Sequence, residues 1–512
     1  MARFAARWFL LIFPTFFAAG ALAQTPSPRM EPASHRAAHA SPVAAPSQQL
    51  FGAIPLSTKS EDARKSLELA WDKYENAMYD PAADIARQAA KKDPQSALSF
   101  AMVSFAARRG MPDAAAVAKA KALLPRATPD EQLVVRWMTA IQDHNLLPAI
   151  ANMNDLLKRY PHDKHVLYVT GEWLFLQQDN DRARTLLETA LQVDPNFPAA
   201  LNRLGYLYLD SSNPDPAKAV ASLKRYAEVQ PTSPNPQDSL GEVLRGAGDD
   251  QGSIEHYQAA LKIDSAYISS QYGIGVVRTL MGEPQAARQE FDRAMLMAQN
   301  PMDELYVKYL KTFVYFWEGK PAEGRAAFAT LAKEAAGKKE PNSQFQIGLA
   351  QAMLAADPQS ELEQLKSLSA FLAHPLAGMN ESDRGIARAA VLRERVRVLA
   401  LQRKTDDASQ TASELQALAT ASRDQLIASY YESALGYVLA SKGDFQGAAE
   451  GLSADEHSPL ALRQLATVQE KLGNAAAAEA ARACLKYHRS SEAEWFLATH
   501  TGQPPSIASL EN

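Results

Sequence analysis

The chain has 512 residues, of which 46% are hydrophobic and 22% are charged, and its formal net charge is −5. This length can hold about three domains of ~150 residues, or one long array of stacked repeats, which has no globular size limit. A mildly acidic chain is a poor candidate for binding nucleic acid, because it lacks the excess positive charge that phosphate contacts require. One cysteine, Cys484, excludes an internal disulfide, and its helix-forming surroundings predict a small buried side chain rather than an intermolecular bridge.

The first 23 residues have the pattern of a secretory signal peptide. Arg3 and Arg7 flank the start of an apolar run over residues 8–19, and small residues at 21–23 permit cleavage. The run is shorter than the ~20 residues that a membrane span needs, and Pro14 interrupts it, so a cleaved signal is favoured over a retained anchor. No cysteine follows the run to accept a lipid. We expect an exported protein, periplasmic or secreted from a bacterial-type cell, with no stable transmembrane segment after cleavage.

Downstream of the signal, proline and glycine mark where helices can and cannot form. Residues 24–57 are rich in proline, alanine and serine, which predicts a flexible linker with no fixed face on which His35 and His39 could bind a metal. Further along, Gly282-Glu283-Pro284 and Gly319-Lys320-Pro321 share the pattern Gly-x-Pro between two helical segments. The glycine adopts the left-handed conformation that ends one helix, and the proline begins the next helix.

A fixed period runs through the middle of the chain. Three series of residues keep step at spacings of 34 to 36: Gly171, Gly205, Gly241 and Gly275; Ala183, Ala219, Ser253 and Ala287; Leu187, Leu223, Tyr257 and Phe291. Each period predicts a pair of helices, the first of them at His165–Gln178 and Asp181–Val193. We expect each glycine to lie where the two helices of a pair come closest. Close packing would then offset the ~1 kcal/mol that a helical glycine costs relative to alanine.

This pattern resembles the tetratricopeptide repeat, a 34-residue helix pair with the form W-x2-L-G-x2-Y, A-x3-F and then P. The clearest unit reads Leu204-Gly205-x2-Tyr208, Ala219-x3-Leu223 and then Pro231. A later unit keeps the spacing but has Arg278 where the family prefers an aromatic residue. The resemblance implies an all-α fold, a right-handed superhelical solenoid of stacked helix-turn-helix units whose first helices line a concave groove.

The register of the repeats predicts the organisation of the whole chain. We expect a signal peptide at 1–23, a linker at 24–57, degenerate helical hairpins at 58–161, tetratricopeptide repeats at 162–300, divergent helical repeats at 301–425, C-terminal hairpins at 426–495 and a tail at 496–512. Residues 340–425 have helical composition but fall out of register, so divergent repeats and another helical module both stay open for them.

The resemblance implies a scaffold or adaptor that binds a protein or peptide partner in the groove. The candidate groove residues lie on the first helices, opposite the packing face: Tyr168, Glu172, Phe175, Asn202, Arg203, Tyr206, Asp238, Glu242, Arg245 and Tyr272. They combine aromatic side chains with both signs of charge, which suits an extended peptide. Asn202 and Arg203 are similar to half of the carboxylate clamp in one subclass of these repeats. Asp238 and Glu242 would repel a carboxylate, so we do not expect a clamp.

Other clusters point to structure rather than chemistry. His162 and His165 supply only two metal ligands and predict surface histidines at the start of a helix. The turn at 246–252 (GAGDDQG) lacks phosphate-loop spacing. Aromatic residues within 306–317 recur at helical spacing and predict core packing. The arginines within 384–404 predict the solvated back of a packed helix, with a dock for an acidic partner or an anionic envelope surface as the alternative.

We assign no catalytic, metal-binding or cofactor-binding residue from the sequence, and we expect a protein that is not an enzyme. Two alternatives stay open. One is a hydrolase or carbohydrate-processing enzyme with a site in residues 300–425, which a deep pocket lined by paired carboxylates would support. The other is a regulatory or assembly subunit of a separate envelope complex.

Overall fold

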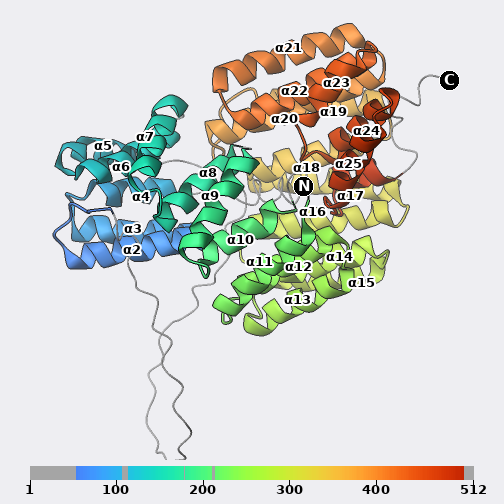
Figure 1. Cartoon of the computed structure of the whole chain (residues 1–512). Helices are drawn as coiled ribbons and strands as arrows, with labels where there is room; N and C mark the ends of the chain where they lie inside the picture. The colour runs from blue at the N-terminus through green and yellow to red at the C-terminus, as the bar shows by residue number, and fades with distance from the viewer. Residues whose placement is uncertain (1–53, 107–112, 144, 178, 210–213, 501–512) are drawn as a thin grey trace, which may run out of the picture.

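The computed structural model describes residues 54–106, 113–143, 145–177, 179–209 and 214–500. Every regular element in these ranges is helical, and successive helices pack as antiparallel hairpins that stack into a curved array (Figure 1). The predicted all-α repeat fold is confirmed. The expected signal peptide, nearly all of the expected linker and most of the expected tail lie outside the described residues.

The N-terminal hairpins share one continuous core. Their elements are α2 (Glu61–Glu75), α3 (Tyr79–Lys92), α4 (Ala97–Ala106), α5 (Ala114–Leu123), the 3-10 helix Leu124–Arg126, α6 (Pro129–Gln142) and α7 (Leu146–Arg159). The buried face of α3 consists largely of alanines such as Ala82, Ala86 and Ala89. Because alanine adds little bulk, α2 and α4 can pack closely against α3, while Trp71 and Trp137 fill the space between helices.

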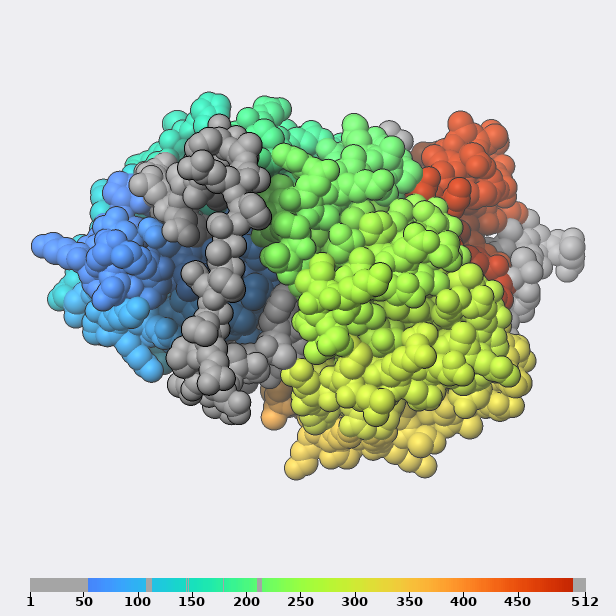
Figure 2. All heavy atoms as spheres, turned by 90° about the horizontal axis from the view of Figure 1, so that it is seen from below, coloured from blue at the N-terminus to red at the C-terminus, as the bar shows by residue number. Residues whose placement is uncertain are grey.

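The middle hairpins follow the predicted period. They consist of α8 (Lys164–Leu176), α9 (Asn180–Val193), α10 (Pro198–Leu207), α11 (Pro216–Val229), α12 (Asn235–Ala247), α13 (Asp250–Ile263), α14 (Ile268–Leu280) and α15 (Pro284–Met297). The predicted first pair, His165–Gln178 and Asp181–Val193, agrees with α8 and α9 to within two residues. In the space-filling view these hairpins, in green, form a continuous wall with the yellow hairpins that follow (Figure 2).

The glycines of the period lie where the two helices of a pair touch, as predicted. A Cβ atom on Gly205 would lie 2.4 Å from the Cγ atom of Leu223, and a Cβ atom on Gly275 would lie 2.8 Å from the Phe291 ring. The same holds at Gly171 and Gly241, which face the side chains of the third series in their own repeats. No side chain fits at these points without displacing a buried neighbour.

The turns between helices use the predicted residues. Gly248, Gly282 and Gly319 adopt positive φ angles of 89°, 74° and 77°, and Pro284 and Pro321 begin α15 and α17. In the turn that superficially matches a phosphate loop, the Asp249 side chain accepts a hydrogen bond from the Gly252 backbone N–H and caps α13. This segment is therefore an inter-helix turn.

The chain continues as helix pairs to its C-terminal part, including the region that falls out of register. The helices are α16 (Pro301–Trp317), α17 (Pro321–Lys338), α18 (Pro341–Met353), α19 (Pro358–Phe371), α20 (Glu381–Leu401), α21 (Thr405–Ser422), α22 (Gln425–Ser441), α23 (Phe445–Ser453), α24 (Pro459–Lys471), α25 (Ala475–Lys486) and α26 (Ala493–Thr499). As predicted, Tyr306, Tyr309, Phe313 and Phe316 lie in the core, and Cys484 is buried. No helix within the described ranges has both the length and the apolar character of a membrane span.

The prediction of a solvated basic face on residues 384–404 is wrong for three of its arginines. Arg384, Arg393 and Arg397 are buried, because α20 is packed by neighbouring helix pairs on several sides. Each guanidinium has carboxylate partners: Arg384 pairs with Glu381, Arg393 with Asp455 and Glu494, and Arg397 with Glu361 and Glu394. Buried arginines require such partners, since an unpaired charge in the interior is strongly unfavourable.

Candidate binding surface

The ten predicted groove residues lie on four successive first helices, α8, α10, α12 and α14. We call the side of the array formed by these helices and α16 the inner face. Figure 1 places α12, α14 and α16 toward the middle of the molecule, and α13 and α15 along its edge. The structure brings the predicted residues together in one chain of contacts that links each first helix to the next.

Between α8 and α10 the link is an ion pair. Arg203 donates from Nε and Nη2 to the Glu172 carboxylate over 2.5 and 2.7 Å, and its guanidinium carbon lies 4.5 Å from the centre of the Phe175 ring. Glu172 is only 2% exposed, so the paired arginine offsets the cost of burying its charge. On the same helix, the Tyr168 hydroxyl donates to the Glu75 carbonyl oxygen over 3.3 Å.

Between α10 and α12 the link is a hydroxyl network. The Tyr206 hydroxyl lies 2.6 Å from Glu242 Oε2 and 3.0 Å from Ser239 Oγ, and Ser239 Oγ donates to Asn202 Oδ1 over 3.1 Å. Burial and the Glu242 carboxylate raise the pKa of Tyr206 well above its usual value, so the hydroxyl keeps its proton. Asn202, Tyr206 and Glu242 are each half-buried, and each keeps some surface accessible.

Between α12 and α14 the link includes a buried acid. The Ser270 hydroxyl donates to Asp238 Oδ1 over 2.6 Å, and burial, followed by the Glu242 carboxylate, raises the pKa of Asp238 to about 8. Burial thus favours the protonated form of Asp238. Nearby, Arg245 Nη1 lies 3.2 Å from the Tyr257 hydroxyl, and the Tyr272 ring meets the edge of the Tyr306 ring at 5.3 Å between centroids.

The predicted residues thus divide by exposure. Six are buried in the described structure: Tyr168, Glu172, Phe175, Asp238, Arg245 and Tyr272. Four keep some exposure: Asn202, Arg203, Tyr206 and Glu242. The buried residues pack within and between the repeats. A partner on this surface would therefore contact the four exposed residues first. Their role in binding a partner stays a prediction.

Sequence reasoning missed an occupant of the inner face. Residues 487–499, which we call the C-terminal strap, run from the end of α25 across α12 and α16 and include α26. A Cβ atom on Gly246 would lie 3.2 Å from the Tyr487 carbonyl oxygen, so the strap passes close to the backbone of α12. Arg489 pairs in bidentate fashion with Asp250 at 2.9 and 3.0 Å. The strap therefore joins segments about half the chain apart.

The second half of the strap is anchored by two carboxylates and an aromatic cluster. Tyr309 donates its hydroxyl proton to Glu492 Oε2 over 3.0 Å. Glu494 accepts from Arg393 Nη2 over 2.5 Å and from Ser458 Oγ over 2.7 Å. The Phe496 ring packs against Phe316 and Trp317 of α16, with centroids 6.0 and 5.7 Å apart. The signal for this docking was the Trp495-Phe496 pair, at the boundary where we expected the hairpins to end and the tail to begin.

Comparison with known proteins identifies the repeat. The tetratricopeptide repeat family profile matches residues 174–237, which run from the end of α8 to the start of α12. The match covers the helices α9 to α11 and their flanks. A human relative, tetratricopeptide repeat protein 7B, is 26% identical over 118 residues, which are 23% of this chain and 14% of the relative. This chain thus spans a small part of that relative's length.

Solved structures of tetratricopeptide repeat proteins are also similar in part. A tetratricopeptide repeat protein from Parabacteroides merdae is 14% identical, covers 51% of this chain and 98% of its own, and has a TM-score of 0.38. YrrB, described as a tetratricopeptide repeat protein with an unusual peptide-binding site, is 15% identical, covers 44% of this chain and 100% of its own, and has a TM-score of 0.28.

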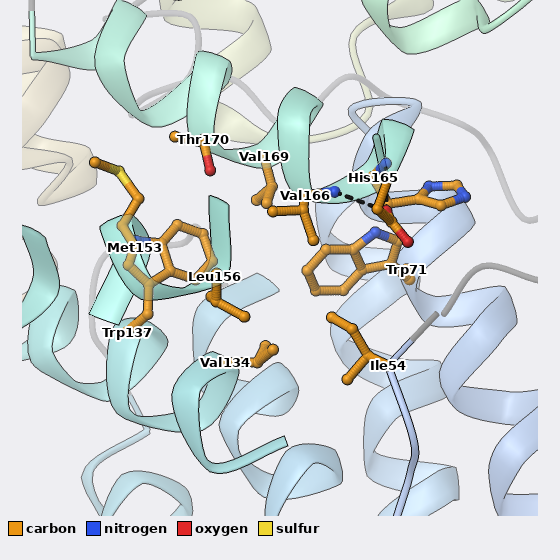
Figure 3. A pocket seen from close by; sticks show the side chains of 11 residues that line it. Ile54, Trp71, Val134, Trp137, Met153, Leu156, His165, Val166, Val169 and Thr170 are labelled. Atoms are coloured by element: carbon orange, nitrogen blue, oxygen red, sulfur yellow. Dashed lines mark hydrogen bonds between the residues drawn. The ribbon is translucent and has the colours of Figure 1, made fainter. Parts of the chain in front are cut away.

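A small pocket lies next to the repeats, between α2, α6, α7 and α8 (Figure 3). Its lining is mainly apolar, and His165 stands at its edge. His165 is buried, with Nδ1 2.8 and 3.1 Å from the Glu75 carboxylate, to which Trp71 Nε1 also donates. The prediction of a surface histidine is wrong for His165, because α2 covers it, and right for His162. The described residues contain no cluster of histidine, cysteine and acidic side chains suited to a metal.

Residues 300–425, where an enzyme site was the alternative prediction, contain two neighbouring carboxylates that are bound by an arginine. Arg397 Nη2 lies 3.0 Å from Glu361 and 2.6 Å from Glu394, and all three side chains are buried. Burial raises the pKa of Glu361 to about 9. Glu361 ties α19 to α20 through Arg397, and Glu394 of the same helix balances the charge of that arginine.

Proposed function

We propose that the chain is an exported scaffold that binds a protein or peptide partner through the inner face of its tetratricopeptide repeats. One observation carries this proposal: the inner face binds a peptide segment of its own chain, the C-terminal strap. On α16, the Tyr309 hydroxyl donates to Glu492, Trp317 Nε1 donates to the Ser491 carbonyl oxygen, and the Phe496 ring packs against Trp317. Arg489 adds a bidentate ion pair with Asp250 at the adjoining start of α13. These are the contacts by which protein grooves recognise peptides.

The exposed part of the inner face beside the strap is suited to a partner. Asn202, Tyr206 and Glu242 are held in place by Ser239 and by each other. Side chains already fixed by neighbours lose little conformational entropy when a partner binds. The face offers hydroxyl, amide and carboxylate groups around an aromatic ring, so we assign it to a polypeptide partner and not to a catalytic reaction.

The export part of the proposal rests on the N-terminal pattern. A positive start, an apolar run over residues 8–19 and small residues at 21–23 are typical of a cleaved signal. We therefore propose a periplasmic or secreted location. Expression in a bacterial host followed by fractionation and intact-mass measurement tests this. The mature chain should begin at Gln24 and leave the cytoplasm, and a cytoplasmic chain that retains residues 1–23 would refute it.

Site-specific photo-cross-linking tests the binding surface. A benzophenone amino acid placed at Tyr206 should capture one discrete partner in the native host. The same group at Leu296, which is 88% exposed on α15, should not. With the captured partner purified, Glu242→Lys should weaken binding at least tenfold, whereas Glu228→Lys on the exposed side of α11 should leave it unchanged. Equal cross-linking at Tyr206 and Leu296, or equal effects of the two lysines, would refute a partner site on the inner face.

A further inference from the structure

The C-terminal strap reveals the chemistry selected at the end of the inner face, where α16 adjoins α20 and α24. We infer that the partner of the inner face is a protein segment of acidic-aromatic type, with two acidic residues separated by one residue and followed by aromatic and aliphatic residues, and that it exchanges with the strap. The strap itself has this pattern in Glu492-Ala493-Glu494-Trp495-Phe496-Leu497. This inference rests on the proposed function and specifies its partner.

The groups that receive the strap are donors and cations, which select for acidic segments. Tyr309 donates to Glu492, and both Arg393 and Ser458 donate to Glu494. These donors come from α16, from α20 and from the start of α24, so they fix the positions of two successive carboxylates. A basic residue in place of Glu494 would lie against Arg393, and basic residues at both positions would lose both sets of hydrogen bonds.

The backbone of the strap is held independently of its sequence. Trp317 Nε1 donates to the Ser491 carbonyl oxygen over 2.8 Å, and Arg463 Nη1 donates to the Leu497 carbonyl oxygen over 2.8 Å. These two contacts bracket the acidic pair and would hold any segment of matching length. The strap is therefore held through its backbone as well as through its acidic and aromatic side chains.

Release of the strap leaves Arg393, the charged group beneath it, with a partner. Arg393 keeps a second carboxylate, Asp455, at 2.6 Å, and the Tyr430 ring remains 4.7 Å from its guanidinium carbon. An arginine with no other partner would become an uncompensated buried charge and would prevent release. On the strap side, burial raises the pKa of Glu492, so its docked anion is destabilised and regains full hydration when it leaves.

The aromatic residues of the strap determine the fraction of chains in which the strap is undocked and its binding surface is accessible. Trp495, Phe496 and Leu497 are all buried, so the docked form predominates. A partner segment must compete with it, and its apparent affinity is reduced by the small fraction of undocked chains. Weakening the aromatic contact should therefore increase apparent affinity for a segment added in trans, which a purely structural strap would not do.

The test uses the full-length chain and a fluorescein-labelled synthetic peptide of residues 487–499, with binding followed by anisotropy. Phe496→Ala should bind the peptide at least tenfold more tightly than the unmodified chain, and Leu296→Ala, at an exposed site far from the strap, should bind it as weakly as the unmodified chain. A peptide with lysine in place of both glutamates should not bind. Glu494→Gln provides a second weakened strap if Phe496→Ala fails to fold, with circular dichroism verifying the fold.

The outcomes separate this inference from the proposed function. If folded Phe496→Ala and Glu494→Gln chains both fail to bind the peptide, or bind the lysine peptide equally well, the acidic-aromatic assignment is overturned. Partner cross-linking at Tyr206 would then persist if the proposed function is correct. If the peptide binds and the captured partner lacks an acidic-aromatic segment that competes with it, the assignment of the partner is also overturned.

Discussion

Replacing Gly205 with alanine tests the close contact on which the repeat depends. The added Cβ atom would lie 2.4, 2.6 and 3.0 Å from Cγ, Cδ2 and Cδ1 of Leu223, whereas ordinary carbon contacts lie near 3.4 to 4 Å. Leu223 is fully buried, next to Tyr226 and Leu240, so it cannot simply rotate into solvent. The two helices must separate or Leu223 must leave its preferred rotamer.

The magnitude follows from two opposing terms. Alanine in place of a helical glycine contributes ~1 kcal/mol of stability through backbone entropy. Overpacking a buried contact costs ~1–3 kcal/mol. We expect Gly205→Ala to lower the free energy of unfolding by up to about 2 kcal/mol. Gly337→Ala is the matched control, because Gly337 is exposed near the end of α17 and a Cβ atom there meets nothing within 4 Å. It should raise stability by up to ~1 kcal/mol.

Urea unfolding followed by circular dichroism measures both variants. A double-mutant cycle with Leu223→Ala assigns the cause: with Leu223 shortened, the alanine at 205 should no longer destabilise, and the coupling should exceed ~1 kcal/mol. If Gly205→Ala stabilises the chain as much as Gly337→Ala does, the close contact does not explain why the repeat has a glycine in its first helix.

Three further predictions concern buried charge. Asp238→Asn should stabilise the chain increasingly as pH rises from 5 to 8. The pKa of Asp238 is raised from 3.8 to about 8, so the stability that the protonated group provides is fully present below about pH 4 and is lost as the pH rises to 8. Thermal melts at several pH values check this, and a constant difference between the two chains would contradict it. Glu172→Gln should lower the free energy of unfolding by about 3 kcal/mol, because Arg203 loses its charge partner. Replacing both Glu172 and Arg203 with leucine should lower it far less, and equal losses from the single and the double change would argue against a buried ion pair. Glu494→Gln should cost only about 1 kcal/mol in urea unfolding, since Asp455 still pairs with Arg393, and a loss above about 3 kcal/mol would show that this second pair does not suffice.

Local features of the repeats were predictable because each repeat contacts mainly its neighbours. The spacing of Gly205 and Leu223 predicts a close helix pair, and that contact exists. The residues at the turns predicted helix ends at Gly282 and Gly319, and both glycines have the left-handed backbone. Such features depend on contacts within about 34 residues, which a period in the sequence records directly.

Burial of the charged residues was less predictable. Arg393 and Arg397 follow a helical pattern that is typical of a solvated face, yet both are buried. The carboxylate partners of Arg393 lie 62 and 101 residues away in the sequence, and periodicity carries no information about pairs at such distances. His165 is a similar case, because its partner Glu75 comes from α2, 90 residues earlier.

The sequence by itself determined the repeat unit of this protein. That unit is a helix pair with a glycine at its tightest contact, and it recurs often enough to form a solenoid. Only the tertiary structure decided what covers the inner face. The curvature that accumulates over many repeats brings Arg489 to Asp250 and Glu492 to Tyr309. Because this curvature is the sum of small rotations between repeats, the sequence of one repeat does not predict which distant segments meet.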